Sequence, residues 1–476
     1  MNLKPGIIIF FLGFSILLTV LGCNKDNFKE PIESPTLYRT TMDQSKLLKR
    51  DTIIAHSLSN IADYDAHINI QPEIKYQKMD GFGYTLTGGS ALHLHAMSTA
   101  ERANILRELF TREGNGIGLD YLRISIGGSD LDERPWSYDD RPDGEIDTDL
   151  QYFSMAYDTL YLVPILKEIL HLNPHLKLMG SPWSPPAWMK DNQDTRGGSL
   201  LPQYYPSYAN YFVKYINAME VEGITIDAIT VQNEPLHPGN NPSLLMLPEE
   251  QATFVKNHLG PAFHENGITT KIIIYDHNAD RPDYPITILD DPEAAQYIDG
   301  SAFHLYGGTI DTLTTVHEAH PDKNLYFTEQ WIGAPGDFAV DVPWHVENLI
   351  IGAPRNWCKT VLEWNLAADE NQNPHTDRGG CNRCLGAITI SGDTVIRNPA
   401  YYIIAQASRF VPTGSVRIAS NNDGDVINVA YSTPKNQTVV ILQNKKEAAV
   451  KIQLKKNEKY IEVILSPKEI ATLVWP

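Results

Sequence analysis

The sequence predicts an α/β protein, a (β/α)8 TIM barrel with an attached antiparallel β-sandwich side domain. Three observations lead to this fold. Eight short apolar segments alternate with helical stretches between residues 80 and 396, as in repeated βα units with parallel strands. From residue 397 to residue 476 the helical patterns stop and β-rich segments follow one another. No Gly-rich dinucleotide turn follows any of the eight segments, which argues against a doubly wound open sheet.

The predicted barrel strands are short, and helix signals separate them. The strands are Gly81–Tyr84, Tyr121–Ile126, Leu176–Ser181, Ala228–Gln232, Lys271–Tyr275, Ser301–Leu305, Leu325–Thr328 and Thr360–Asn365. Ser98 and Glu101 form a capping box that opens a helix through Leu109. Pro248 opens another helix, with acidic residues at its positive end. Residues 206–221 have helical periodicity before a stop at Gly223.

Two segments that flank the barrel are predicted to form the side domain. The C-terminal strands are Val426–Tyr431, Thr438–Leu442, Val450–Leu454, Tyr460–Leu465 and Glu469–Val474. Residues 51–79 contain short alternating segments, such as His67–Ile70, that we expect to contribute N-terminal strands to the same sandwich.

The N-terminus has the features of an export signal. Gly6–Gly22 is almost wholly apolar and shorter than a typical membrane-spanning helix, and it ends in Val20-Leu21-Gly22-Cys23, the pattern of a bacterial lipobox. We expect residues 1–23 to be a lipoprotein signal peptide, Cys23 to carry the lipid, and the protein to be exported and anchored to the outer membrane, at the cell surface or the periplasmic face. An uncleaved signal anchor is the alternative. Residues 24–50 are polar and are predicted to be a spacer.

Composition restricts the partners of the folded body. The chain of 476 residues has 58 acidic and 39 basic residues and a net charge of −19, which argues against nucleic acid and anionic lipid as partners. A neutral polysaccharide is compatible with this charge. We expect a monomer that reaches the membrane only through its lipid.

The cysteines and histidines give no metal-binding pattern. Cys358 is predicted to be a buried thiol, and Cys381 and Cys384 lie in Gly-Gly-Cys-Asn-Arg-Cys. A local disulfide is favoured over a metal site for this pair, because an exported protein meets oxidising conditions and no second CxxC is present. His93, His95 and His237 show no metal-ligand spacing, so no metal and no cofactor is expected.

Two predicted strands end in a glutamate. Strand four leads into Asn233-Glu234-Pro235 and strand seven into Thr328-Glu329-Gln330. Catalytic groups of such barrels lie at the carboxyl ends of the strands, so the two carboxylates face each other across the mouth. Glycoside cleavage needs such a pair, with Glu234 as acid/base and Glu329 as nucleophile. We expect neighbouring negative charge to raise the pKa of Glu234, and Asn233 to bind the sugar 2-hydroxyl. The alternative is that each glutamate is an ordinary ion-paired residue.

A series of motifs extends over nearly the whole barrel. In order they are Asp80-Gly81-Phe82-Gly83, Tyr121-Leu122-Arg123-Ile124, Gly128-Ser129-Asp130, the segment Ser181-Pro182-Trp183-Ser184-Pro185-Pro186-Ala187-Trp188-Met189-Lys190, Asn233-Glu234-Pro235, Phe303-His304-Leu305-Tyr306, Phe327-Thr328-Glu329-Gln330 and Glu363-Trp364-Asn365-Leu366. With these motifs the sequence resembles glycoside hydrolase family 30, which contains glucosylceramidases and β-1,6-glucanases. The resemblance implies a barrel with a β-sandwich, retention of configuration and no cofactor.

The resemblance also implies roles for individual residues. Asp130, Trp183 and Asn233 would hold the glucose on the non-reducing side, with Trp364 at the base of that subsite. Arg123 would pair with a catalytic carboxylate, and His304 and Tyr306 would flank the nucleophile. Charge-assisted hydrogen bonds and stacking on indole rings are the physical basis for such sugar contacts. Trp188 is expected in the core, and a purely structural role is the alternative for His304.

Two segments bear on the substrate. Thr87-Gly88-Gly89 departs from the Thr-Asp-Ala of glucosylceramidase-type members, whereas residues 373–386 resemble the loop after strand eight in the β-1,6-glucanase branch. We therefore expect a retaining, endo-acting hydrolase of β-1,6-glucan. An exo-acting β-glucosidase or a glucosylceramidase is the nearest alternative, and a non-catalytic glycan-binding lipoprotein is the alternative from another class.

Overall fold

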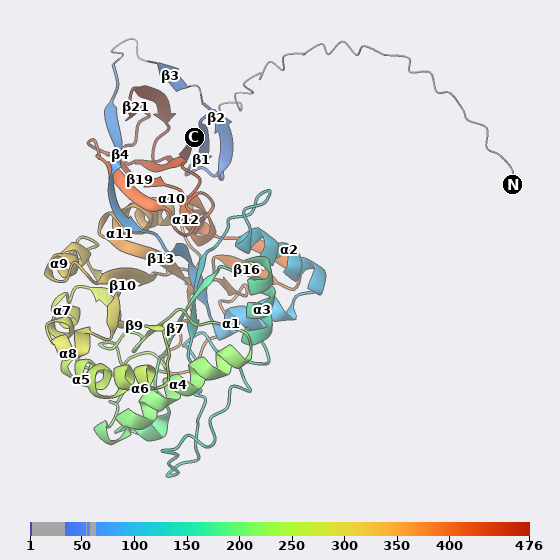
Figure 1. The fold of residues 1–476 in the computed structure, drawn as a ribbon. Helices are drawn as coiled ribbons and strands as arrows, with labels where there is room; N and C mark the ends of the chain where they lie inside the picture. Colours follow the sequence, from blue (N-terminus) through green and yellow to red (C-terminus); the bar gives the residue numbers. More distant parts are fainter. Residues whose placement is uncertain (2–33, 54, 58–62) are drawn as a thin grey trace. The chain divides into compact units, whose positions relative to one another are not determined.

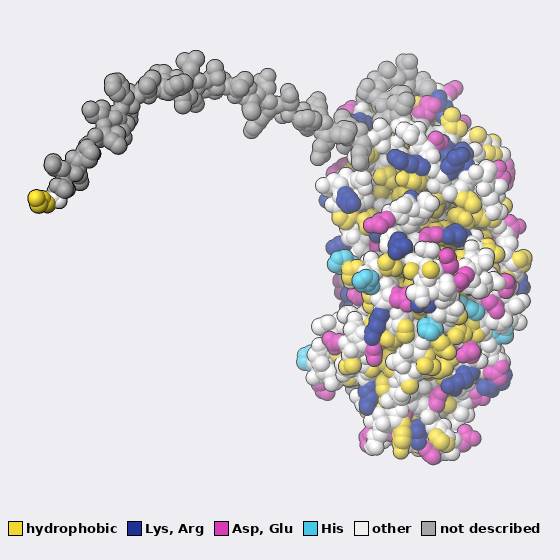
Figure 2. Space-filling view, turned by 90° about the vertical axis from the view of Figure 1, so that its right-hand side faces the viewer, with side chains coloured by type: hydrophobic (Ala, Val, Ile, Leu, Met, Phe, Trp, Pro, Cys, Tyr) yellow, Lys and Arg dark blue, Asp and Glu magenta, His cyan; other side chains and the backbone are white. Residues whose placement is uncertain are grey.

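The computed structural model describes residue 1 and residues 34–53, 55–57 and 63–476. The predicted signal peptide, its lipobox and Cys23 lie outside the described residues. In the described part of the chain, no helix is long and apolar enough to cross a membrane. Charged side chains of both signs are scattered over the face drawn in Figure 2, without an extended basic patch.

Eight parallel strands close into a barrel in the order β10-β11-β13-β5-β6-β7-β8-β9 (Figure 1). The strands are β5 Gly81–Leu86, β6 Tyr121–Ser125, β7 Lys177–Ser181, β8 Ala228–Thr230, β9 Lys271–Ala279, β10 Ile298–Gly308, β11 Asn324–Glu329 and β13 Cys358–Asn365. All eight predicted strands are confirmed. The barrel interior is packed rather than open, because one buried side chain from each of seven strands meets there: Tyr121, Met179, Ala228, Ile273, Ala302, Tyr326 and Leu362.

Helices follow the strands and cover the barrel. They are α1 Gly88–Ala96, α2 Thr99–Phe110, α3 Leu162–Leu172, α4 Tyr205–Val221, α5 Pro248–Phe254, α6 Gly260–Glu265, α7 Asp283–Leu289, α8 Pro292–Ala295, α9 Thr312–Ala319, α10 Phe338–His345, α11 Ala353–Arg355 and α12 Pro399–Ser408. Short 3-10 or π segments cover Ala187–Met189, Pro202–Tyr204, Val255–Leu259 and Val346–Gly352. The predicted cap of α2 is confirmed, since the Ser98 side chain accepts a hydrogen bond from the Glu101 N–H.

Ten strands form the side domain as one sheet in the order β2-β1-β23-β20-β19-β18-β4-β21-β22-β3. They are β1 Thr36–Thr40, β2 Lys49–Thr52, β3 Ala55–Ser57, β4 Ala66–Lys78, β18 Val416–Ser420, β19 Val426–Ser432, β20 Thr438–Asn444, β21 Val450–Lys456, β22 Lys459–Leu465 and β23 Ile470–Trp475. The sheet folds over its own core, in which Leu37, Ile68, Leu442 and Ile452 belong to one cluster. It is mixed rather than purely antiparallel, because β4 and β21 pair in parallel.

Two predicted boundaries are wrong. The predicted spacer, residues 24–50, contains a structural strand, because β1 pairs with β23 and buries Leu37 in the sheet core. The helices do not stop at residue 397 either. The helix α12 lies between the barrel and the sheet, where Tyr84 of β5 donates to the Ala400 carbonyl and Thr472 of β23 donates to the Gln406 carbonyl. A buried two-sided contact of this kind is not visible as local periodicity.

Short two- and three-stranded sheets brace the loops at the barrel mouth. The strand β12, Ile332–Gly333, follows Glu329 and pairs with β15, Cys384–Leu385. The strands β14 Ala367–Ala368, β16 Ile388–Ser391 and β17 Thr394–Arg397 form the other small sheet.

Candidate active site

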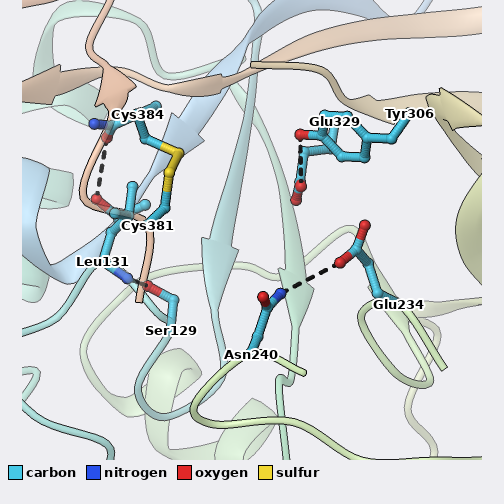
Figure 3. Close-up of a disulfide and its surroundings, with 10 residues drawn as sticks. Ser129, Leu131, Glu234, Asn240, Tyr306, Glu329, Cys381 and Cys384 are labelled. Atoms are coloured by element: carbon cyan, nitrogen blue, oxygen red, sulfur yellow. Dashed lines mark hydrogen bonds between the residues drawn. A yellow bond between two sulfur atoms is a disulfide. The ribbon is translucent and has the colours of Figure 1, made fainter. Parts of the chain in front are cut away.

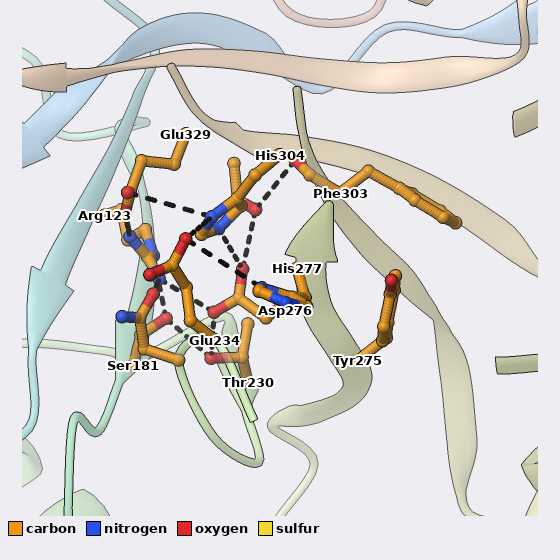
Figure 4. A network of polar contacts seen from close by, with 12 residues as sticks. Arg123, Ser181, Thr230, Glu234, Tyr275, Asp276, His277, Phe303, His304 and Glu329 are labelled. Carbon is orange, nitrogen blue, oxygen red and sulfur yellow. Dashed lines mark hydrogen bonds and ion pairs between the residues drawn. The ribbon is translucent and has the colours of Figure 1, made fainter. Parts of the chain in front are cut away.

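Side chains from six barrel strands converge at the carboxyl ends of the strands (Figure 4). Arg123 of β6 lies at their centre and is fully buried. Its guanidinium donates to Glu329 Oε2 at 2.6 Å, to Asn233 Oδ1 at 2.6 Å and to Asp276 Oδ2 at 2.7 Å. It also donates to Ser181 Oγ at 2.9 Å. The contact predicted between Arg123 and a strand-end carboxylate is therefore present.

The two strand-end glutamates face each other across His304. A carboxylate oxygen of Glu234, a ring nitrogen of His304 and a carboxylate oxygen of Glu329 all lie within 4.8 Å of one another. His304 Nδ1 is 3.1 Å from Glu234 Oε1 and 3.7 Å from Glu329 Oε1. The Tyr306 hydroxyl donates to Glu329 Oε1 at 3.1 Å. His304 and Tyr306 thus flank Glu329 as expected, but His304 lies closer to Glu234.

Two residues whose carboxylates belong to the site, Glu234 and Asp276, have unusual backbone conformations. Glu234 has a φ of 45° and Asp276 a φ of 63°, in the left-handed region that side-chain-bearing residues seldom adopt. The two residues support each other, because the Glu234 N–H donates to the Asp276 carbonyl at 3.0 Å. The local strain at the ends of β8 and β9 is thereby held by the fold around it.

Asp276 and His304 form the second layer of this network. Asp276 is fully buried and accepts from Thr230, Thr328, Arg123 and His304. Burial raises its pKa, but the charge of Arg123 and the bond from His304 outweigh burial and hold the pKa of Asp276 well below its ordinary value. For His304, burial lowers the pKa, but the charge of Glu329 and the bonds to Asp276 and Glu234 raise it to about 10. His304 is therefore an imidazolium at neutral pH, with both ring N–H groups directed at carboxylates.

The expected rise of the Glu234 pKa is wrong for this arrangement. Burial does raise it, but the hydrogen bond and the charge of His304 outweigh burial, so the pKa of Glu234 lies below its ordinary value. The pKa of Glu329 is raised, by burial first, despite the charges of His304 and Arg123. Because the Glu234–His304 contact is a hydrogen bond, the proton that the sequence assigned to Glu234 is held on His304, one short transfer away.

An open pocket of about 350 Å³ lies over these groups. Its lining includes Asp130, Glu234, Tyr306, Glu329 and Trp364. Beneath it the indole rings of Trp183 and Trp364 lie 5.3 Å apart, and the Arg123 guanidinium lies 4.8 Å from the Trp183 ring. Burial, and then the charges of Glu329 and Glu234, raise the pKa of Asp130 to about 8. A cavity of this size, with aromatic rings beside convergent polar groups, suits a small polar ligand unit such as a sugar.

The loop after β13 forms one wall of the pocket, and a disulfide joins Cys381 and Cys384 within it (Figure 3). Both cysteines line the pocket. Cys384 belongs to a cluster with Leu131, Trp183 and Trp364. The Cys381 backbone N–H partly offsets the rise in the Asp130 pKa, and the Thr376 N–H donates to the Asp130 carbonyl at 2.9 Å. The disulfide favoured by the sequence is thus present, and Cys358 is a buried free thiol as predicted.

Comparison with known proteins identifies the family. The family model for the glycosyl hydrolase family 30 TIM-barrel domain matches residues 79–411, and the model for the family 30 β-sandwich domain matches residues 414–473. The chain belongs to glycoside hydrolase family 30. It is similar to an endo-1,6-β-D-glucanase of Neurospora crassa, with 34% identity over 430 residues that cover 86% of this chain and 88% of that protein.

Two further comparisons cover most of the chain. Mouse lysosomal acid glucosylceramidase is 27% identical over 97% of this chain and 94% of its own length. Among solved structures, the endo-β-1,6-glucanase BT3312 superposes with a TM-score of 0.86 and 36% identity, covering 93% of this chain and 99% of that chain. The resemblance to family 30 and the barrel-and-sandwich fold are therefore confirmed.

Several polar residues of this family 30 site escaped the sequence analysis. Asp276 follows the fifth strand as Tyr275-Asp276, and its position at a strand end was the available signal. Ser181, Thr230 and Thr328 bind Arg123 or Asp276, but single hydroxyl residues in strands carry no distinctive pattern. Trp188 lies in the core, where its indole N–H donates to the Asp139 carbonyl at 3.0 Å.

The glycine pair after the first barrel strand has a structural reason. A Cβ at Gly88 would lie 1.8 Å from Asp132 Oδ1, and a Cβ at Gly89 would lie 2.7 Å from Pro374 Cδ. The space that a larger residue needs is therefore filled by Asp132 and by the loop after β13. Gly89 therefore leaves room for Pro374 of that loop, and Gly88 leaves room for Asp132.

Proposed function

We propose that this family 30 member is a retaining, endo-acting hydrolase of β-1,6-glucan, with Glu234 as acid/base and Glu329 as nucleophile. The relatives named endo-1,6-β-D-glucanase and the structure of BT3312 support the substrate class. The observation that supports the mechanism is the close approach of the two carboxylates, with oxygens within 4.8 Å of each other. Retaining enzymes separate these groups by about 5–5.5 Å, whereas inverting enzymes leave about 6.5–9.5 Å for a water.

In the first step Glu329 attacks the anomeric carbon. The bond from that carbon to the glycosidic oxygen breaks, its electron pair goes to the oxygen, and the oxygen takes a proton from Glu234. Arg123 and Tyr306 hold Glu329 at the two ends of its carboxylate, which fixes its orientation. His304 lies 3.1 Å from Glu234, so the two groups share a hydrogen bond and titrate together, and the acid step requires Glu234 in its protonated form.

In the second step water hydrolyses the glycosyl ester. Glu234, now ionised, takes a proton from the water, whose oxygen bonds to the anomeric carbon while Glu329 leaves with its electron pair. Loss of the Glu329 charge in the ester removes one of the charges that hold the proton on His304. The pKa of His304 therefore differs between the two steps, because Glu329 is charged before the first step and esterified before the second.

The same proposal covers sugar binding. Trp364 forms an apolar base for the glucosyl ring, with Trp183 packed behind it, and Asp130 binds the hydroxyls of that ring. Asn233 Oδ1 accepts a hydrogen bond from Arg123, which leaves the Asn233 NH₂ group for the sugar 2-hydroxyl. The Trp183 indole N–H is buried without a hydrogen-bond partner among the described residues, as expected for a group that binds substrate.

We further propose that the protein is an exported lipoprotein. The lipobox that ends at Cys23 supports acylation of that cysteine, which would hold a monomeric enzyme at the outer membrane, on the cell surface or the periplasmic face. Metabolic labelling with a fatty-acid analogue should label the wild-type protein and not Cys23→Ala.

Product analysis on linear β-1,6-glucan tests the proposed activity. We expect a ladder of short β-1,6-linked oligosaccharides from the wild type and none from Glu329→Gln, with the surface variant Glu293→Gln as the matched control. Release of glucose alone would overturn endo action and favour the exo-glucosidase. No product from the wild type would overturn the glucanase assignment, and glucosylceramide hydrolysis would then be assayed. Unimpaired glycan binding without any hydrolysis would indicate a binding protein.

A further inference from the structure

The pocket has a second polar side that the sugar-binding residues named above do not use. His237 and Asn240, from the loop after β8, and His277 and Asn278, from β9, line the same cavity as Glu234. Asn240 Nδ2 donates to Glu234 Oε2 at 3.3 Å, and His277 Nδ1 is 3.9 Å from Glu234 Oε1. These contacts are with Glu234, whereas Arg123 and Tyr306 contact Glu329.

This second side has unused hydrogen-bonding capacity. His277 is only 6% exposed, and among the described residues its Nδ1 has no hydrogen-bond partner. Asn278 Oδ1 accepts from the Tyr306 N–H, and within the described part of the chain its NH₂ group has no acceptor. Asn240 uses its NH₂ on Glu234, which leaves its Oδ1 as an acceptor. Of these groups only His277 Nδ1 is buried, and buried polar groups are normally satisfied, so a ligand is expected to complete it. Asn240 and Asn278 are half-buried and His237 is exposed.

We propose that His237, Asn240, His277 and Asn278 form the subsite for the leaving group, the glucosyl unit on the reducing side of the cleaved bond. The inference rests on the proposed function, because the acid/base residue must lie next to the leaving oxygen, and these four residues line one pocket with Glu234, which Asn240 contacts directly. Their free groups are both donors and acceptors, which matches hydroxyls. Among the residues that the structure describes, no lysine or arginine lines the pocket, so the subsite suits an uncharged sugar rather than an acidic one.

The loop that carries Asn240 is held in place before any ligand binds. Ser243 Oγ donates to the Asn240 carbonyl at 2.5 Å, and Lys190 Nζ donates to the Ser243 carbonyl at 2.7 Å. On the other side Asn241 Nδ2 donates to the Asp377 carbonyl at 3.0 Å. A preformed subsite loses less conformational freedom when the sugar binds, which increases its contribution to affinity.

Binding and transfer experiments with a β-1,6-linked glucose tetramer test the subsite. The variants are His277→Leu, which removes both ring nitrogens, and Asn278→Asp, which keeps the acceptor for the Tyr306 N–H but removes the NH₂ donor. His258→Gln, a partly buried histidine outside the pocket, is the matched control. The ratio of longer transfer products to hydrolysis products is measured at one tetramer concentration. Both reactions use Glu234 as base, so this ratio reports acceptor binding and not acid/base strength.

We expect this ratio to fall about threefold to tenfold in both variants, as for the loss of one or two hydrogen bonds, and to stay unchanged in His258→Gln. An unchanged ratio with a lower kcat would overturn the subsite and leave the two residues a structural role. Tetramer binding to Glu329→Gln, with and without His277→Leu, tests the subsite without turnover. Equal binding there would also overturn it. If the wild type cleaves no β-1,6-glucan, the proposed function fails, whereas this binding comparison still decides whether the subsite exists.

Discussion

The active site has two regions, and different kinds of contact hold each of them together. The strand-borne network consists of Arg123, Glu234, Asp276, His304 and Glu329. The loop wall consists of residues 184–199, 237–243 and 373–386. In the network, charged groups bind one another directly, with Arg123 paired to Asp276 and Glu329. In the loop wall, an exposed ion pair joins Arg378 to Asp194, and other contacts between loops use neutral groups, such as the Thr195 hydroxyl that donates to Asn241 Oδ1 at 2.6 Å.

His304 in the network and Lys190 in the loop wall are both buried bases, and their pKa values move in opposite directions. Carboxylates surround His304, and they overcome burial and raise its pKa to about 10. Lys190 donates to Ser184 Oγ and to the carbonyls of Thr195 and Ser243, and it has no carboxylate within ion-pair distance among the described residues. Burial lowers the pKa of Lys190 to about 7. Burial lowers the pKa of both bases, and only carboxylate partners, which His304 has and Lys190 lacks among the described residues, reverse that effect.

The largest expected effect is loss of a charge from the strand-borne network. Asp276→Asn leaves Arg123 and His304 without the carboxylate that both contact, and we expect it to lower the free energy of unfolding by about 3–5 kcal/mol, the range for breaking one partner of a buried ion pair. Urea unfolding measures this. Asp290→Asn, at an exposed aspartate paired with His320, is the control and should change stability by about 0.5 kcal/mol or less. Wild-type stability in Asp276→Asn would show that the network is not a structural element.

The second prediction concerns the pH dependence that His304 gives to stability. Between its ordinary pKa of 6.5 and about 10 the native protein holds a proton that the unfolded chain has released. The stabilisation is therefore complete below pH 6.5 and is lost as pH rises to 10, at about 1.4 kcal/mol per pH unit. We expect the stability advantage of the wild type over His304→Gln to shrink from pH 6.5 to 10 in denaturant unfolding. A constant difference would mean that His304 is neutral in the native protein.

Lys190 should act in the opposite direction in an overlapping pH window. Between about 7 and its ordinary pKa of 10.5 the unfolded chain keeps a proton that native Lys190 has released. Stability therefore rises with pH, again by about 1.4 kcal/mol per unit. Relative to Lys190→Met, the wild type should gain stability from pH 7 to 10. The same slope in both proteins would show that Lys190 stays charged in the fold. His304 and Lys190 change the stability of the protein with pH in opposite directions. Their contributions are therefore separated by comparing the stability of each variant with that of the wild type at every pH.

The sequence predicted the strand-borne network better than the loop wall. Glu234, Glu329, Arg123 and Asn233 sit at strand ends or within short motifs, where the barrel itself determines that they meet. The charge states of these side chains were harder to predict from the sequence. Repulsion between the glutamates was foreseen, but the position of His304 between Glu234 and Asp276 decides where the proton resides, and that position depends on three-dimensional geometry.

The elements that the sequence missed all depend on long-range contacts. β1 looks like a polar linker until β23, more than 400 residues later, offers it an edge to pair with. The helix α12 looks like the start of the β-rich region until its contacts with β5 and β23 are known. His277 and Asn278 carry no motif, and their significance comes from the pocket that they share with Glu234.

The smallest expected effect tests whether the loop wall contributes to binding independently of the network. Replacing both Cys381 and Cys384 by alanine opens a cross-link that closes only a short loop, so stability should fall by about 2 kcal/mol or less. The Cys381 N–H stabilises the charged form of Asp130, and among the described residues the hydrogen bonds of Arg123 go to Ser181, Glu329, Asn233 and Asp276 and not to Asp130. We therefore expect KM for β-1,6-glucan to rise about threefold, the worth of one weakened hydrogen bond, with kcat nearly unchanged. Wild type treated with a thiol reductant should behave in the same way, since Cys358 is buried and unpaired in both proteins. A large fall in kcat would instead show that the wall and the network are one unit, because the disulfide would then be holding the charged groups as well as the sugar.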